Sequence, residues 1–220
     1  MSETILPIFP LPNMVFFPGM RLPLHIFEPR YRQMLEEALA GEKRIGLVLL
    51  REGWEKDYYG SPETYRIGSH GRVDNLARLP DGRFNLTLEE AVRFEIIDFV
   101  RHTPYRMARV RLLPEEPPPP PAAGARQMEQ LVRLYASLSR IVGQDPAPEF
   151  YPDRPQEFEM HVNALAMSLR VHPALRQDLL EAPGPGERAR RLETLLARLV
   201  ERLTAQKRFD SLKPKSGDVN

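Results

Sequence analysis

Side chains that could act as nucleophiles or metal ligands are few and scattered in this sequence. There is no cysteine, which excludes disulfides, thiolate metal sites and a cysteine nucleophile. The five histidines show no HExxH or comparable ligand spacing, so we expect no bound metal. These histidines are His25, His70, His102, His161 and His172.

Ser69 and His70 come nearest to part of a catalytic triad. Neighbouring residues on a strand point to opposite faces of the sheet, so this hydroxyl and imidazole cannot pair as nucleophile and base. Glu28 has no second carboxylate placed to form an acid–base pair with it. It precedes an expected helix, and we expect it to cap the positive N-terminus of that helix, with Arg30 or Arg93 as an ion-pair partner.

Motifs for nucleotide binding and acyl transfer are missing as well. The sequence contains no G-x-x-x-x-G-K-[ST] loop for phosphates, and neither S-x-x-K nor G-x-S-x-G spacing for a serine nucleophile. We therefore predict that the chain is not an enzyme and carries no catalytic residue, metal or cofactor.

The charge of the chain is balanced, with 31 basic and 30 acidic side chains. This balance gives no electrostatic support for nucleic acid or an anionic membrane as a partner. No apolar run reaches the roughly 18 residues of a membrane span, and the N-terminus lacks the features of a signal peptide. We expect a cytoplasmic location; the oligomeric state is left open.

Aromatic residues gather in a polar stretch between Arg51 and Tyr65, where Trp54, Tyr58 and Tyr59 stand among acidic side chains. Aromatic side chains on a loop that a rigid scaffold carries are a common binding arrangement. The alternative is that they fold back and cover one end of the scaffold. The sequence does not decide between the two.

The scaffold before residue 114 is mostly strand-like. Short apolar runs broken by proline, at Ile5–Phe9 and Leu22–Ile26, predict edge or bulged strands, and the continuous run Ile45–Leu50 predicts a buried one. Gly82 supplies the turn of a hairpin. The remaining strands are expected at 72–79, 84–88, 92–100 and 105–113, and one amphipathic helix at 29–39, ended by Gly41.

The chain changes character at a run of five prolines, residues 117–121, which cannot form a helix or a paired strand. Apolar stripes at helical spacing follow it, and one of these helices is expected to start near Asp153 with Gln156 as its capping partner. We predict an α+β fold: a small barrel or sandwich followed by a helical bundle. The expected divisions are 1–114 for the strand unit, 115–124 for a proline-rich connector, 125–209 for the bundle and 210–220 for a disordered tail.

Residues 11–34, LPNMVFFPGMRLPLHIFEPRYRQM, closely resemble the opening of Lon N-terminal domains, which share a PL-x-x-x-V-x-FPG-x-x-LPL core. Stand-alone members of this family continue with HIFEPRYRxM. Ala91 departs from the pattern, because the family often has a glycine there and a positive φ would strain alanine. Further segments match in order: Ile67-Gly68-Ser69, Pro80-Asp81-Gly82-Arg83, Arg93-Phe94, Gln177–Glu181 and Glu187-Arg188.

The resemblance covers about residues 5–203 and implies a PUA-like β-barrel followed by a helical bundle. It also implies recognition of unfolded or tagged polypeptide, without the ATPase and Ser-Lys peptidase of full-length Lon. A different class of function, RNA binding, is the alternative, because PUA-like barrels of other families bind RNA. Its sequence support is the basic stretch of Arg106, Arg109 and Arg111.

We therefore expect a non-catalytic module that binds unfolded or exposed apolar segments of a polypeptide or a partner protein, as a substrate-recognition module or as an adaptor for a separate protease. The hypothesis places an extended apolar peptide on the aromatic loop and in the groove between barrel and bundle. Most of the apolar residues in the FFPG and LPLHIFEPRY segments are expected to be structural, in the core or at the rim of the barrel. The candidate binding residues are Trp54, Tyr58, Tyr59, Phe16, Phe17 and Met20.

Overall fold

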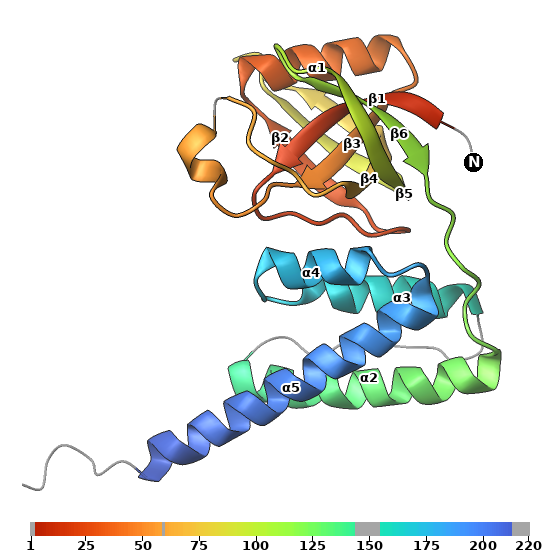
Figure 1. Ribbon diagram of the computed structural model, residues 1–220, viewed down its shortest axis with the longest axis vertical. Coiled ribbons are helices and arrows are strands. Elements are labelled where there is room, and N and C mark those ends of the chain that lie inside the picture. Colours follow the sequence, from red (N-terminus) through yellow and green to blue (C-terminus); the bar gives the residue numbers. More distant parts are fainter. Residues whose placement is uncertain (1–2, 59, 144–154, 213–220) are drawn as a thin grey trace, which may run out of the picture.

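The computed structural model describes residues 3–58, 60–143 and 155–212, and it confirms the α+β class. The strands and one helix form one unit, and the later helices form a second unit beside it (Figure 1). The strand unit comprises β1 (Glu3–Leu11), β2 (Leu22–Ile26), α1 (Pro29–Ala40), β3 (Arg44–Leu49), a 3₁₀ turn η1 (Trp54–Asp57), β4 (Ile67–Arg78), β5 (Phe84–Arg101) and β6 (Arg106–Leu112). The helical unit comprises α2 (Pro121–Val142), α3 (Pro155–Ser168), α4 (Pro173–Leu180) and α5 (Pro185–Leu212).

The six strands form one sheet in the order β2-β5-β4-β3-β1-β6, and β5 also pairs with β6. Five of the strands therefore make a closed ring, with β2 added outside it on β5. The hairpin at Gly82 is confirmed, since its φ of +81° is readily adopted by glycine alone. The two strands expected at 84–88 and 92–100 are one strand of 18 residues, so that division was wrong. The positive φ near its middle falls on Glu90, at 55°, and not on Ala91.

The prolines of β1 show how a proline-broken run can occupy the middle of a sheet. β1 pairs with β6 through residues 3–8 and with β3 through residues 8–11. Pro7 therefore lies where only β6 flanks the strand, and Pro10 lies where only β3 does. Each proline occupies a local edge, which a residue without an N–H tolerates. The edge prediction holds for β2, which pairs with β5 alone, whereas β1 as a whole is an inner strand.

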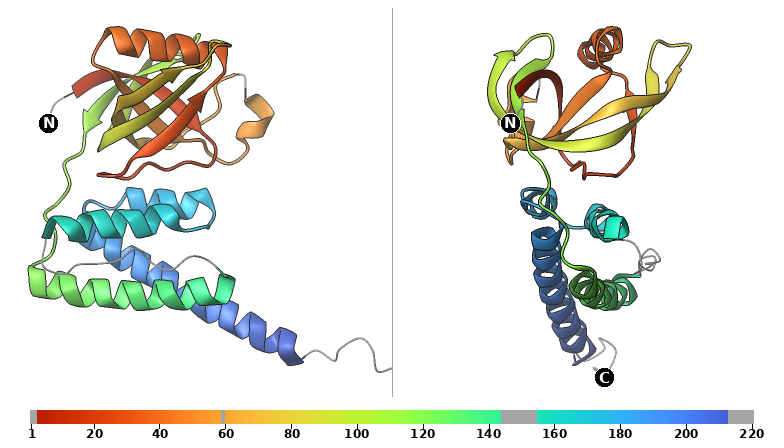
Figure 2. Two further views of the ribbon diagram at one scale, coloured as in Figure 1. Left: turned by 180° about the vertical axis from the view of Figure 1, so that it is seen from behind. Right: turned by 90° about the vertical axis from the view of Figure 1, so that its right-hand side faces the viewer.

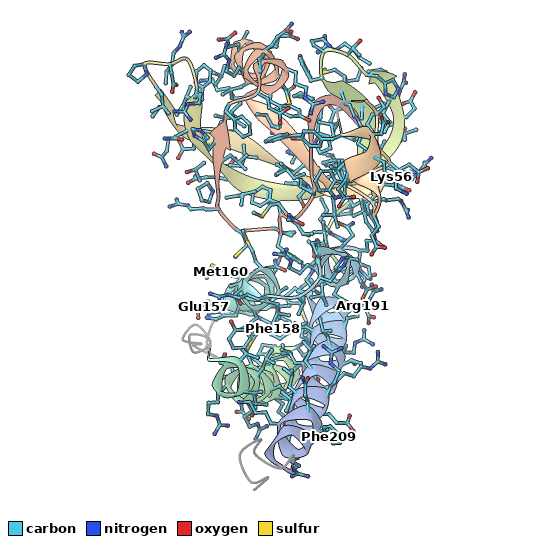
Figure 3. The ribbon with its side chains drawn as sticks, turned by 90° about the vertical axis from the view of Figure 1, so that its left-hand side faces the viewer. Lys56, Glu157, Phe158, Met160, Arg191 and Phe209 are labelled. Carbon is cyan, nitrogen blue, oxygen red and sulfur yellow. The ribbon has the colours of Figure 1, made fainter. Side chains whose placement is uncertain are left out.

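The helical unit lies under one end of the sheet, with α3 and α4 nearest to the strands and α2 farther away (Figure 2). Phe158 of α3 is buried among these helices, while Met160, two residues on, lies on their outer side (Figure 3).

Two expected boundaries of the helical unit were wrong. Helix α2 already begins at Pro121, inside the predicted connector, and α5 continues to Leu212, beyond residue 209. The predicted start near Asp153 and the tail from 213 lie outside the described residues.

A buried polar cluster joins the two units. The guanidinium groups of Arg93 on β5 and Arg188 on α5 both bind the carboxylate of Glu115, in the proline-rich segment. Arg188 also donates to the Oδ1 of Asn163, 2.8 Å away, and the Asn163 amide nitrogen donates to the carbonyl of Pro18 at 2.9 Å. We call Glu115, Arg93, Arg188 and Asn163 the Glu115 network. The predicted partnership of Arg93 with Glu28 is therefore wrong.

Candidate functional site

A groove of about 250 Å³ opens between the aromatic loop of the strand unit and the start of α4. Its floor includes Leu49 and Leu50 at the end of β3, both buried. Trp54 lines the groove from the strand unit, and the turn His172-Pro173-Ala174 lines it from the helical unit. This is the groove that the sequence hypothesis placed between the two units. An apolar floor between aromatic and polar walls can bind an apolar side chain while leaving the peptide backbone hydrated.

Tyr58 fixes the aromatic loop to the start of α1. Its hydroxyl donates to the Glu28 carboxylate at 2.6 Å, and its ring lies 5.3 Å from the Arg30 guanidinium. Burial, followed by this hydrogen bond to Glu28, raises the pKa of the Tyr58 hydroxyl. The ring of Trp54 meets Tyr58 edge-on, with 5.5 Å between centroids. Tyr58 therefore positions the loop, and Trp54 is the member of the pair that faces the groove.

Glu28 was predicted to cap α1, and this prediction was wrong. No side-chain hydrogen bond caps that helix, because the Glu28 carboxylate is held by Tyr58 and by Arg30, whose Nε lies 3.0 Å away. The expected ion pair with Arg30 is confirmed. Both partners bring the carboxylate toward the aromatic loop and away from the backbone N–H groups.

Charged residues line the rim of the groove. The ring of His172 lies 3.7 Å from the carboxylate of Glu52, another lining residue, and both side chains are exposed. The Arg176 guanidinium donates to the carbonyl of Asn13 at 2.7 Å, linking α4 to the loop after β1. Sequence reasoning missed Asn13 and residues 172–174 as groove residues, because they lie more than 100 positions apart and only the tertiary fold brings them together.

The other candidate binding residues fall into different places. Phe16 and Phe17 are 1% and 0% exposed, so neither offers a surface to a peptide. Phe16 packs into the core under α1, and Phe17 packs into the core of the helical unit. The prediction that Phe16 and Phe17 bind peptide is therefore corrected, and their burial fits the expectation that they are structural residues. Met20 is half-buried against both cores, while Tyr59 lies outside the described residues.

The basic stretch of β6 is not a free positive surface. Arg109 pairs with Asp98 at 3.2 Å, and Arg111 pairs with Glu95 at 3.0 Å. Arg106 is buried, and it donates to the carbonyl of Pro62 at 2.8 Å. RNA binding through these three arginines is therefore not supported, because two are neutralised on the surface and the third is buried.

Ser69 and His70 lie inside the strand unit, 0% and 2% exposed. The Ser69 hydroxyl and both ring nitrogens of His70 have no hydrogen-bonding partner among the described protein groups. Burial, and to a smaller extent the charge of Arg44, lower the pKa of His70 to about 4. The described geometry contains no nucleophile–base pair at this position.

Stability is expected to fall when the pH drops from 7.5 to 5, because His70 is buried in its neutral form. An unfolded histidine takes up a proton near pH 6.5, whereas the folded one resists until about pH 4. Acid therefore favours the unfolded state, and linkage gives a loss of about 2 kcal/mol at pH 5. His70→Phe keeps the ring that stacks on Phe94 and should remove this part of the pH dependence in urea titrations. Parallel curves for the two proteins would rule the effect out, and His102→Gln on the surface is the control.

Within the described ranges, no cluster of histidine and carboxylate side chains is arranged to hold a metal ion. In the same ranges, no helix has the length and apolar character that a bilayer span demands.

Comparison with known proteins agrees with this arrangement of strands and helices. A family model described as the ATP-dependent protease La (LON) substrate-binding domain matches residues 5–198. The chain belongs to the Lon substrate-binding domain family. The Lon protease of Trichlorobacter lovleyi is 26% identical over 205 residues, which cover 92% of this chain and 25% of the relative. That of Dictyoglomus thermophilum is 26% identical over 204 residues, covering 90% and 25%.

Two solved structures share the Lon N-terminal fold. The crystal structure of a Lon N-terminal domain protein from Xanthomonas campestris has 25% identity and a TM-score of 0.58, covering 88% of this chain and 98% of that one. The N-terminal domain of a Mycobacterium avium complex Lon protease has a TM-score of 0.60 at 17% identity, covering 90% and 98%. This chain spans about a quarter of the length of the two Lon proteases named above.

Proposed function

We propose that this Lon substrate-binding domain is a non-catalytic module that binds exposed apolar segments of polypeptides. The observation that carries the proposal is the groove between the two units, which is lined by Trp54, by Pro173 and by two buried leucines. The family description supports polypeptide as the ligand class. In this proposal the closed ring of strands is the PUA-like barrel, and the four packed helices are the bundle, both in the cytoplasm.

The groove suits an extended chain better than a folded surface. The groove lies between two units that the Glu115 network holds together, so the residues that line it are in place before a ligand binds. A preformed groove binds at lower entropic cost than one that must be ordered by the ligand. Its charged rim keeps the empty groove hydrated, and its aromatic wall gives contact area without requiring one particular sequence.

Trp54→Ala is expected to weaken binding of an unfolded model protein about tenfold or more, since a buried tryptophan contact is a typical hot spot. Trp54 is the single tryptophan of the chain, so ligand binding in the groove should also shift its fluorescence. Phe27→Ala is the matched control, because Phe27 is an aromatic side chain of the same unit, 58% exposed and outside the groove. Equal affinity of the Trp54 variant and the unmodified protein would eliminate the groove as the site.

A further inference from the structure

A second cavity, of about 650 Å³, lies on the strand unit next to the Trp54 groove and shares no lining residue with it. Pairing of β4 with β5 begins at Ile67 and Glu95, and the N–H of Ile96 donates to the carbonyl of Arg66 at 2.8 Å. Beyond this point the two segments separate. Residues 61–64 line one side of the cavity and residues 96–99 of β5 line the other. One wall is therefore an extended strand.

Arg106 is the unusual residue of this cavity. It is 7% exposed, its guanidinium donates to the carbonyl of Pro62, and it lies 5.5 Å from the ring of Phe99. No ion pair involves it among the described residues. Burial lowers the pKa of Arg106, and the charge of Arg30 lowers it further, while Tyr31 and Asp57 act in the opposite direction. The other two buried arginines, those of the Glu115 network, both contact a carboxylate.

The charges around Arg106 also favour an anion. Arg66 is exposed at the cavity, with no side-chain hydrogen bond or ion pair to any described residue, and His102 lies nearby. Arg51 completes the basic side chains, with its guanidinium over the ring of Tyr65. Two carboxylates line the cavity, those of Glu63 and Asp98, and Asp98 is already paired with Arg109. Positive charge is thus left over, and part of it is buried.

We propose that this cavity binds a carboxylate of an extended polypeptide, with Arg106 and Arg66 as its ligands. A buried guanidinium gains most from an anion, because water solvates it poorly and a charge-assisted hydrogen bond is stronger in a low-dielectric site. The strand β5 along one wall suits an extended chain. A polypeptide is favoured over nucleic acid because Glu63 and Asp98 would repel a run of phosphates, while one carboxylate can avoid them.

This inference rests on the proposed function for its ligand class, a polypeptide, but the cavity at Arg106 is a site separate from the Trp54 groove. The probe is a fluorescently labelled peptide of alternating valine and glutamate, acetylated and amidated, measured by anisotropy at low salt. Its glutamine counterpart removes the charge at constant shape, and a glutamine peptide with a free C-terminus tests the chain end as the source of the carboxylate. A single-stranded RNA oligomer serves as competitor.

We expect the glutamate peptide, or the glutamine peptide with a free end, to bind at least about tenfold more tightly than the amidated glutamine peptide. Arg106→Met and Arg66→Gln should each remove most of this difference, while Arg111→Met on the same strand, which pairs outside the cavity, should not. Arg66 is exposed, so its variant tests the site even if the Arg106 variant does not fold.

Equal affinity for all three peptides would overturn the carboxylate site, as would unchanged binding in the Arg66 variant or tighter binding of the RNA. The Trp54 groove is tested separately, with an unfolded model protein, the Trp54→Ala variant and tryptophan fluorescence, so either site can fail alone. If the protein binds the three peptides equally but Trp54→Ala still weakens binding of the unfolded model protein, only the carboxylate site is refuted. If the peptides bind with different affinities but Trp54→Ala has no effect on the model protein, only the groove is refuted.

Discussion

Glu115→Gln is expected to destabilise the domain by about 3–5 kcal/mol, although it changes one oxygen to nitrogen. Glu115 is the carboxylate that both Arg93 and Arg188 contact, and these two guanidinium groups are 2% and 0% exposed. Without its charge, the two buried cations would keep carbonyl groups and Asn163 as hydrogen-bond acceptors. The nearby carboxylate of Glu159 acts on both guanidinium groups, but no ion pair joins it to either one among the described residues. For a chain of this size the loss corresponds to a melting temperature roughly 10 °C lower.

Glu116→Gln provides a closely matched control for the Glu115 network. Glu116 is the next residue in the same proline-rich segment, and it is exposed. Substitutions at exposed positions of this kind usually change stability by less than about 0.5 kcal/mol. Arg188→Met should reproduce most of the Glu115→Gln effect, because it leaves Asn163 and the carbonyl of Leu179 without their donor. Thermal unfolding by circular dichroism measures all three, and coincident curves for the two glutamate variants would refute the account.

The same network should also control how firmly the two units are joined. Its members come from β5, the proline-rich segment, α3 and α5, and Asn163 reaches the Pro18 carbonyl in the segment between β1 and β2. Weakening it loosens the contact on which the Trp54 groove depends. The Glu115 variant is therefore expected to show faster amide hydrogen exchange in α3 and in the segment between β1 and β2, in addition to melting earlier.

The sequence predicts those helices and turns whose ends are set by a single proline or glycine. Pro29 and Gly41 define α1 within one residue at each end, and Gly82 defines the β4–β5 hairpin. The pairing of β5 with both β4 and β6 was not predictable in this way. This pairing depends on register shifts after Ile96 and Phe99, and the alternation of apolar and polar residues in the sequence does not reveal such shifts. Two separate strands were predicted for this reason where one bent strand exists.

The candidate site also contains residues that local sequence reveals and residues that only the tertiary fold brings there. Trp54 is recognisable as an aromatic residue in a polar loop, but its neighbours in the groove, residues 172–174, are set by tertiary packing alone. Phe16 and Phe17 are strongly apolar neighbours, which a composition argument cannot distinguish from a binding patch. Their burial in two different cores follows from the way the segment after β1 passes between the strand unit and the helices.

Gly68→Ala is expected to cost about 3 kcal/mol or more, close to the effect at Glu115. A Cβ built on Gly68 would lie 2.2 Å from the carbonyl oxygen of Leu47 and 2.8 Å from a methyl group of Val48. The carbonyl belongs to the backbone of β3 and cannot move without breaking the sheet, so the overpacking penalty should reach the upper end of its usual range or exceed it. Gly41→Ala is the control, because its Cβ would meet nothing closer than 3.8 Å. Urea unfolding of the two variants tests this, and a Gly68→Ala protein as stable as the Gly41→Ala protein would show that β3 and β4 are not packed this closely.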